Sequence, residues 1–217
     1  MRVKTLFLVA VLIGAEALLL RLGVWQMHRM EQKNAEKAAF MATLDDRTKT
    51  FTGRFDHSRE VVLESQKRRN DYGYRILTPL VTSEQEIIVD RGWVRRSFEP
   101  HYLARFHVPG EVTVKGILLD PPVLKQAFMK GPVKGAGAEG VGVLKVLKPD
   151  EIPPGKKPRL DRYLQATTNT HPQVDAFFVP PPGGAKHREY MLTWFSLALI
   201  LPLLVAGLFW RRKPPRS

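Results

Sequence analysis

The stretch HREYMLTWFSLALILPLLVAGLFW, from His187 to Trp210, lies close to the end of the chain and decides how the chain is organised. From Met191 onward it contains twenty residues without a charge. A bilayer core of about 30 Å is crossed by about 20 apolar residues in a helix. The stretch therefore predicts a membrane-spanning helix, although a histidine, an arginine, a glutamate and a tyrosine stand at its beginning.

A second apolar run, TLFLVAVLIGAEALLLRLGVW (Thr5–Trp25), carries charge only at Glu16 and Arg21 and predicts a first span. The alternative is a secretory signal peptide, because AEA after the first apolar residues resembles a cleavage site. The apolar run resumes at once with Leu18–Leu20, so we favour an uncleaved anchor. Four residues precede the run and form no transit peptide, which favours a bacterial inner membrane over a mitochondrial one.

The net charge of +13 suggests nucleic acid at first sight, but its distribution indicates a membrane. Six of the basic residues flank the two spans on short tails: Arg2, Lys4, Arg211, Arg212, Lys213 and Arg216. Basic residues on short flanking segments mark the cytoplasmic side, whereas long loops translocate largely regardless of charge. We therefore expect both termini in the cytoplasm, residues 26–186 outside, and no nucleic acid partner.

The fold class predicted is a membrane protein with two transmembrane helices and an intervening extracytoplasmic β-rich (α+β) domain, built as an antiparallel sheet or a small barrel. The expected segments are a cytoplasmic N-terminus (1–4), a first span (5–25), a helical extension (26–44), the β-rich domain (45–178), a linker (179–186), the second span with its polar threshold (187–210) and a basic cytoplasmic tail (211–217).

The β-rich assignment depends on short runs enriched in Val, Ile, Leu, Thr and aromatic residues and bounded by turn residues. The runs are KTFTGRF (49–55), REVVLES (59–65), YRILTPLV (74–81), EIIVDRGWV (86–94), EVTVKGILL (111–119) and VGVLKVL (141–147), with RYLQAT (162–167) and DAFFVP (175–180) as weaker candidates. A short helix is expected in FEPHYLARF (98–106).

Signatures of catalysis are missing from the sequence. GAGAEG (135–140) fits the dinucleotide pattern G-x-G-x-x-G, but no strand–helix context surrounds it, so we expect a surface loop. The six histidines show no spacing typical of a metal site, and no nucleophile motif occurs. With no cysteine, thiolate sites and disulfides are excluded. We therefore expect a protein that is not an enzyme, and most of its histidines on the surface.

Two polar positions in the spans stand out. Glu16 lies inside the first span, where a carboxylate is costly; it either faces a partner subunit or Arg21, or is shielded by the second span. At about 100° per residue, His187, Tyr190 and Trp194 share one stripe of the second span, with Leu197 and Leu201. A neutral imidazole there is able to ligate haem iron, with the macrocycle between the spans. Arg29, one turn beyond Trp25, is suited to acidic groups of such a ligand.

Three blocks of the sequence resemble the Surfeit locus protein one family, the membrane assembly factors of cytochrome c oxidase. They are LGVWQMHRMEQK (22–33), ILTPL (76–80) with IIVDRGWV (87–94), and HREYMLTWFSLA (187–198). The chain departs from the pattern at Arg188, Glu189, Met191 and Arg95, and residues 98–179 have no counterpart block.

The resemblance implies transient binding of haem a and help with its insertion into subunit one of the oxidase, with haem a synthase as a further partner and lipid around the spans. It implies His187 as the iron ligand and a site that includes Trp25, Gln26, Arg29, Tyr190 and Trp194, with Thr193 in the same block. For Arg91, Gly92 and Trp93 we expect structural roles: a buried pair, a turn and the core. The alternative function is a scaffold without a cofactor that stabilises nascent oxidase subunits.

Overall fold

The computed structural model describes residues 2–68, 71–95, 100–121, 142–144 and 151–211. The chain forms two compact units, one made of Met1–Ala42 and Pro180–Ser217 and the other of Thr43–Val179. The expected loop at 135–140 lies outside the described residues.

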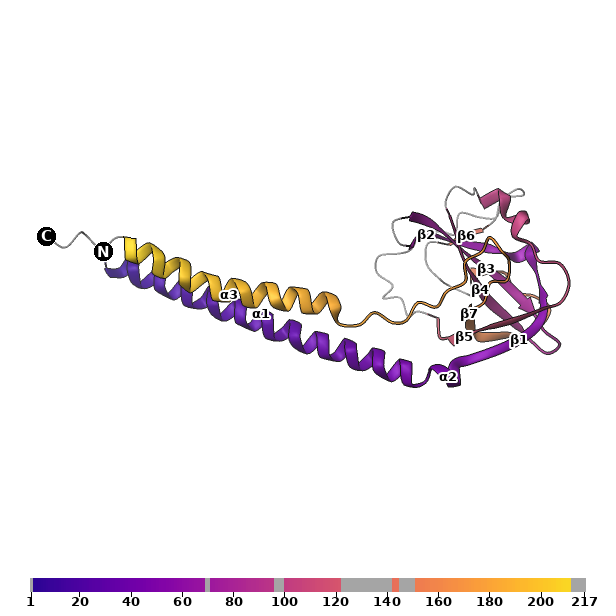
Figure 1. Ribbon diagram of the computed structural model, residues 1–217, viewed down its shortest axis with the longest axis horizontal. Helices are drawn as coiled ribbons and strands as arrows, with labels where there is room; N and C mark the ends of the chain where they lie inside the picture. Colours follow the sequence, from indigo (N-terminus) through magenta and orange to yellow (C-terminus); the bar gives the residue numbers. More distant parts are fainter. Residues whose placement is uncertain (1, 69–70, 96–99, 122–141, 145–150, 212–217) are drawn as a thin grey trace. The chain divides into compact units, whose positions relative to one another are not determined.

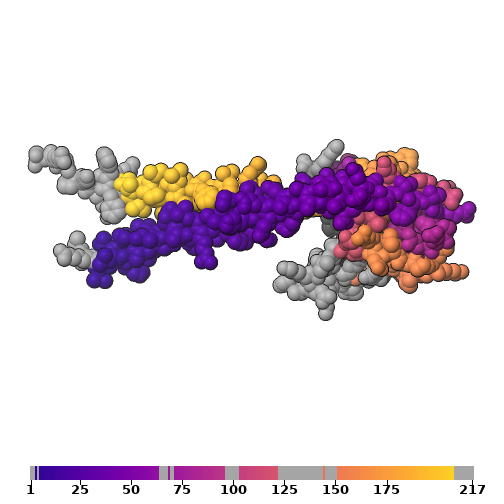
Figure 2. Space-filling model, turned by 90° about the horizontal axis from the view of Figure 1, so that it is seen from below, coloured from indigo at the N-terminus to yellow at the C-terminus, as the bar shows by residue number. Residues whose placement is uncertain are grey.

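The first unit is a helical hairpin of α1 (Arg2–Ala42) and α3 (Ala185–Arg211), which lie side by side (Figures 1 and 2). α1 contains no proline, so the expected first span and its extension form one uninterrupted helix. Thr5–Ala42 and Ala185–Gly207 are long and apolar enough to cross a membrane. Only 6% of the most apolar window of each is buried, which leaves the apolar surface to lipid rather than to a protein core.

A seam of less exposed residues runs along both helices at alternating intervals of three and four. In α1 it contains Leu12, Glu16, Leu19, Gly23, Gln26, Met30, Lys33 and Lys37, and on the α3 side Gly184, His187, Met191, Trp194, Ala198, Leu201 and Val205. This spacing is that of two helices packed side by side with a slight supercoil. The sequence placed Tyr190 and Leu197 on the same stripe, but the seam passes through Met191 and Ala198 instead.

The second unit begins with the single turn α2 (Leu44–Arg47) and is otherwise made of strands and short 3-10 turns. The elements are β1 (Thr48–Phe55), η1 (His57–Arg59), β2 (Val61–Arg68), β3 (Asp71–Val81), β4 (Glu86–Arg95), η2 (Pro100–Phe106), β5 (Val112–Leu119), β6 (Gly142–Leu144) and β7 (Arg159–Ala166).

Among the described residues these strands form one sheet in the order β1-β5-β7-β4-β3-β2-β6 (Figure 1). A further antiparallel pairing of β1 with β3, at Arg54–Val81 and Phe55–Leu80, closes β1, β5, β7, β4 and β3 into a small barrel. The β4–β7 and β2–β6 pairs are parallel and the others antiparallel. Two apolar helices flanking a β-rich barrel confirm the predicted fold class.

The core follows from the alternation of side chains along β4, a strand with buried residues on both faces. Ile87 and Val89 pack into one cluster with Phe55, and Ile88 packs into a second cluster with Tyr163. Successive side chains of a strand point to opposite faces, so one strand supplies both clusters. A third cluster joins β2, β3 and β4 to η2 and to the segment after β7; it consists of Val62, Ile76, Val94, Leu103, Phe106 and Val174.

The first five strand predictions, the weaker one at 162–167 and the short helix are confirmed in place, the helix as the 3-10 element η2. The strand expected at 141–147 is described only at residues 142–144. The strand expected at 175–180 is wrong: Asp175 makes only an isolated bridge to Trp93. β7 already pairs with β4 as far as Asp90, so only a short part of β4 is left to pair with residues 175–180. Pro180 has no backbone N–H and cannot donate a hydrogen bond to a neighbouring strand.

Candidate functional site

His187 and Gln26 meet on the seam of the hairpin. His187 lies in the first turn of α3, and its Nδ1 is 2.7 Å from Oε1 of Gln26. Because Oε1 is an acceptor, the Nδ1–H of His187 donates, and Nε2 keeps its lone pair. The Gln26 side chain is 9% exposed, so the pair is sheltered on the α1 side. An imidazole oriented through Nδ1–H is the usual arrangement of a histidine that ligates a metal through Nε2.

Small residues hold the helices in direct contact on both sides of this pair. A Cβ on Gly23 would lie 2.5 Å from the ring of Phe195, and one on Gly184 would lie 2.5 Å from the carbonyl oxygen of Met30. Close backbone approach at glycine is the common packing mode of membrane helices. No flat macrocycle fits between the helices at Gly23 unless Phe195 moves, so a ligand of His187 has access only from a flank of the hairpin.

The other predicted site residues are distributed between the seam and one flank. Trp194 lies on the seam, and its buried Nε1 has no hydrogen-bond partner among the described residues. Tyr190 is 57% exposed and Trp25 52% exposed. Arg29 donates from Nη1 to Oε1 of Gln32, 2.9 Å away on the same helix. Of these predicted site residues, His187 and Gln26 are the pair for which the described part of the chain shows a hydrogen bond.

On helical wheels of these two antiparallel helices, Trp25, Arg29 and Tyr190 fall on the same side of the seam. We call these three residues the aromatic flank. It offers two exposed rings and a guanidinium beside an imidazole with a free Nε2. Such a surface is suited to a flat, partly anionic ligand.

Glu16 also lies on the seam. Its Oε2 is inaccessible and has no hydrogen-bond partner among the described residues, while Arg21 is exposed. Of the alternatives left open by the sequence, this position favours shielding by the second span over pairing with Arg21.

In the β-rich unit, the RGW block has mostly the structural roles expected. Arg91 is fully buried, with its Nη1 2.9 Å from Oε2 of Glu60. Gly92 has a φ of +128°, and a Cβ there would lie 2.5 Å from the carbonyl oxygen of Asp175. It forms a bulge in β4 rather than a turn. Trp93 is only half-buried and is not part of the core clusters, which corrects its expected place in the core.

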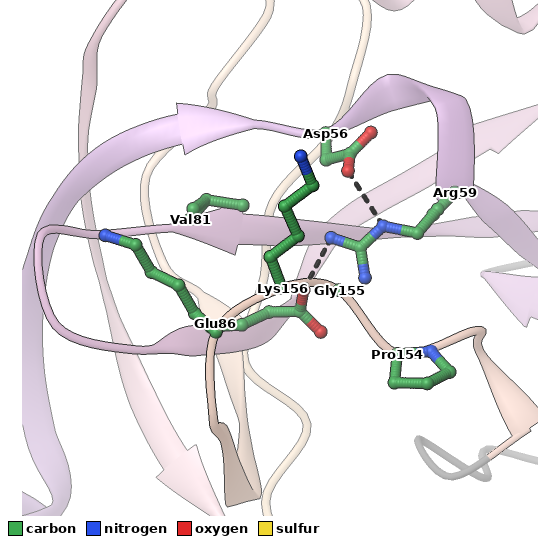
Figure 3. Close-up of a pocket in the computed structure, with 8 residues that line it drawn as sticks. Asp56, Arg59, Val81, Glu86, Pro154, Gly155 and Lys156 are labelled. Atoms are coloured by element: carbon green, nitrogen blue, oxygen red, sulfur yellow. Dashed lines mark hydrogen bonds and ion pairs between the residues drawn. The ribbon is translucent and has the colours of Figure 1, made fainter.

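A pocket lined by Asp56, Arg59 and Glu86 was not foreseen from the sequence (Figure 3). Burial acts to raise the pKa of Glu86, but hydrogen bonds and charge from Arg59 and Arg159 outweigh it and hold the pKa below its usual value. Nη2 of Arg59 is 2.5 Å from one carboxylate oxygen of Glu86, and Nη2 of Arg159 is 2.6 Å from the other. The charged groups satisfy one another, so the pocket wall is a structural clamp.

A second unforeseen group consists of His57, Glu60 and His107, whose nitrogen and oxygen atoms lie within 4.8 Å of one another. Most histidines were expected on the surface; His107 is exposed as expected, whereas the His57 side chain is 15% exposed. Their rings stack with centroids 4.0 Å apart. His57 and Glu60 are only three residues apart, but the fold brings His107 to them from a distant segment, so the sequence does not reveal the complete group.

The comparison with protein families decides the assignment. A model of the SURF1 family matches residues 13–199, which include all three sequence blocks and parts of both helices of the hairpin. The chain belongs to the SURF1 family. A comparison with curated proteins gave no match. SURF1 family proteins are assembly factors of cytochrome c oxidase, so the biological process and oxidase-related partners of this member follow from its membership.

Proposed function

We propose that this SURF1 family protein holds haem a transiently through Nε2 of His187 and assists its insertion into the catalytic subunit of cytochrome c oxidase. The observation that supports this most directly is the hydrogen bond between His187 Nδ1 and Gln26, 2.7 Å long. It fixes the ring and its tautomer without using Nε2. The protein acts by binding and presentation and catalyses no reaction.

The aromatic flank supplies the remaining contacts of the proposed site. Arg29 pairs with the propionates of haem, because its planar fork matches a carboxylate. Trp25 and Tyr190 pack against the macrocycle edge, while Trp194 on the seam supports the imidazole side. Both flank rings are more than half exposed, so the ligand stays accessible from outside the hairpin. An open, one-sided site suits a carrier that must release its cargo.

We further propose that the protein lies in a bacterial inner membrane with both termini in the cytoplasm and residues 43–179 in the periplasm. The basic tails that flank the spans support this orientation. The chain has no cysteine, so single cysteines report topology cleanly. Lys115→Cys, at an exposed position of β5, is expected to react with an impermeant maleimide in intact spheroplasts. Lys213→Cys, in the C-terminal tail, is expected to react only after lysis; the reverse pattern overturns the orientation.

The haem proposal is tested by purifying the full chain from cells that make haem a and recording its Soret band. Wild type is expected to carry haem a, and His187→Ala to lose most of it. His28→Ala is the matched control, because His28 is an exposed histidine of the same hairpin outside the seam. Equal haem content in wild type and His187→Ala rules out the ligand.

The same preparation distinguishes the scaffold alternative. Subunit one of the oxidase and haem a synthase are the partners expected to copurify with the wild-type protein. If subunit one copurifies in full while no Soret band appears in any variant, the protein is a cofactor-free scaffold.

A further inference from the structure

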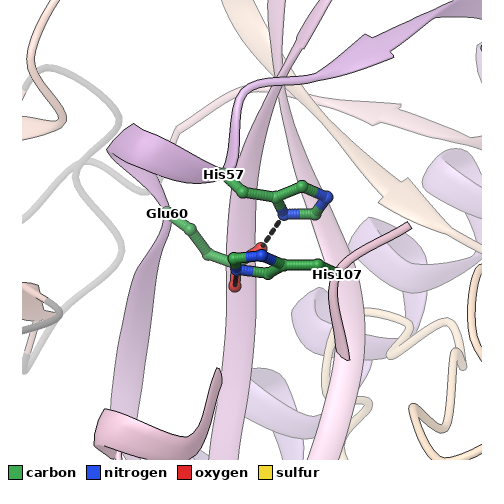
Figure 4. Close-up of side chains that lie close together, drawn as sticks. All are labelled: His57, Glu60 and His107. Atoms are coloured by element: carbon green, nitrogen blue, oxygen red, sulfur yellow. Dashed lines mark hydrogen bonds and ion pairs between the residues drawn. The ribbon is translucent and has the colours of Figure 1, made fainter. Parts of the chain in front are cut away.

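His57, Glu60 and His107 converge at one end of the barrel (Figure 4). His57 begins η1, Glu60 follows η1 directly before β2, and His107 follows η2. The imidazoles stack at an interplanar angle of 16°. Because the nitrogen lone pairs lie in the ring planes, a cation shared by both rings requires the partly exposed His107 ring to turn out of the stack. Neither ring belongs to the helical hairpin, so the group is separate from the proposed haem site.

The carboxylate of Glu60 has one oxygen with several partners and one with none. Oε2 accepts hydrogen bonds from Thr78 Oγ1, from Arg91 Nη1 at 2.9 Å and from His57 Nδ1 at 3.1 Å. Oε1 is buried without a hydrogen-bond partner among the described residues, although the side chain is only 2% exposed. Its nearest cationic candidate is Nε2 of His107, 3.8 Å away. Burying a carboxylate oxygen without a hydrogen-bond partner destabilises the fold, so we expect a ligand to bind at this atom.

His57 is held in a way that suits metal ligation. Its Nε2 lies 3.3 Å from the carbonyl oxygen of Val108 and 3.0 Å from the backbone nitrogen of the same residue. With the proton on Nδ1, the ring donates to Glu60 and accepts from the Val108 N–H. Ligation through Nδ1 requires the proton to move to Nε2, where the ring donates to the Val108 carbonyl and the Val108 N–H loses its acceptor, so this tautomer forms only when a cation binds Nδ1. A carbonyl opposite the ligating nitrogen is the common outer-shell partner of a metal-bound histidine.

We propose that His57 Nδ1, His107 Nε2 and Glu60 Oε1 bind one divalent cation of the zinc type in the extramembrane barrel. Two imidazoles and one carboxylate form a donor set that Zn²⁺ accepts with a fourth position left for water. Calcium and magnesium prefer oxygen ligands throughout and are disfavoured. His107 is 41% exposed at its side chain, which gives the cation a path from solvent.

The charged groups around the three ligands are expected to weaken cation binding without preventing it. Arg91 repels a cation, but its guanidinium contacts Oε2 and not Oε1, so it orients the carboxylate from the opposite side. Burial, together with the charges of His57 and Arg91, holds the pKa of His107 below its usual value despite the opposing charge of Glu60. We expect micromolar binding rather than the far tighter binding of structural zinc sites.

The test is zinc titration of the full-length protein in detergent, purified with a histidine-free tag and freed of metal by a chelator. A chromophoric competitor reports the free Zn²⁺. Wild type is expected to bind one Zn²⁺ per chain, and His107→Gln to bind it at least 100-fold more weakly. His171→Gln is the matched control, because His171 lies in the same unit outside the group. Unchanged affinity in His107→Gln, or no zinc bound by wild type, overturns the proposal.

Three further measurements make the outcome independent of folding and of haem. In chelator, the unfolding midpoint of His107→Gln is expected to match wild type, because the side chain is partly exposed; added zinc raises the midpoint of wild type only. Co²⁺ in place of zinc gives visible absorption bands in wild type that His107→Gln lacks. His187→Ala is expected to bind zinc normally, so failure of the haem proposal leaves this one intact.

Discussion

Gln26 accepts the Nδ1 proton of His187 across the hairpin, over 2.7 Å, and so connects the first and the third of the sequence blocks. The two residues are far apart in the chain, and their side chains meet only because α1 and α3 are antiparallel and closely packed at Gly23 and Gly184. In the proposed haem site, Gln26 therefore orients the imidazole of His187.

The first prediction follows from this role. Gln26→Ala removes the acceptor, leaves the imidazole free to rotate, and is expected to weaken haem a retention by about 10–100-fold, the usual effect of losing an outer-shell partner. Gln26→Glu retains an acceptor at the same place and is expected to keep most of the haem. Retention is measured as Soret absorbance per chain through successive washes. Full retention in Gln26→Ala contradicts the orienting role.

The second prediction concerns Arg91, whose guanidinium contacts three groups. It donates to Glu60 at 2.9 Å, to the carbonyl of Phe106 at 2.5 Å and to Thr170 at 3.1 Å. Arg91→Met leaves Glu60 charged and buried, so we expect a loss of about 3–5 kcal/mol in the free energy of unfolding. Lysine has no planar fork, so Arg91→Lys is expected to recover only a minor part.

A double-mutant cycle checks this explanation. Glu60→Gln in the Arg91→Met background removes the stranded charge and is expected to restore part of the lost stability. Unfolding in urea is followed through Trp93, the one tryptophan in the sequence of residues 43–179. A double variant no more stable than Arg91→Met indicates that packing, and not the charge, causes the loss.

The third prediction separates backbone strain from a steric clash at two glycines. Gly92 and Gly110 both have positive φ, +128° and +83°, but a Cβ meets the carbonyl oxygen of Asp175 only at Gly92. Gly110→Ala is expected to cost about 1 kcal/mol for the unfavourable backbone region. Gly92→Ala adds the clash and is expected to cost at least about 3 kcal/mol, measured by the same urea unfolding. Equal losses at the two sites would argue that the bulge in β4 readjusts freely.

These features differ in how far the sequence predicts them. The spans and most strands follow from local composition and from the period of apolar residues. The buried pair of Arg91 was expected for the RGW block that the resemblance singled out. The complete group of His57, Glu60 and His107 was not expected, because the fold brings His107 to it from a distant segment. The seam was misplaced toward Tyr190 because a stripe drawn on one helix does not reveal where its partner packs. The Gln26–His187 hydrogen bond requires both helices at once.

The last prediction concerns acid, and its sign follows from three pKa shifts. Burial lowers the pKa values of His107 and His171 in the folded protein, so the unfolded chain takes up protons first as the pH falls through about 6.5. The Glu86 carboxylate has its pKa lowered by Arg59 and Arg159 against the effect of burial. The carboxylate contributes fully to stability when the pH is above 4.5, its pKa in the unfolded chain. This contribution is lost as the pH falls through the lower pKa of the folded protein.

Stability of the barrel is therefore expected to decline modestly below about pH 6.5 and steeply below about pH 4.5, as measured by urea midpoints in chelator at each pH. Glu86→Gln removes the anion that Arg59 and Arg159 share, and Asp56 remains paired with Arg59 alone. We therefore expect a loss of about 3 kcal/mol at pH 7 together with a flatter profile below pH 4.5. His171→Gln is expected to flatten only the first part of the decline. The clamp at Glu86 is contradicted if Glu86→Gln is as stable as wild type at pH 7, or if both proteins lose stability in parallel below pH 4.5, since the proton would then bind elsewhere.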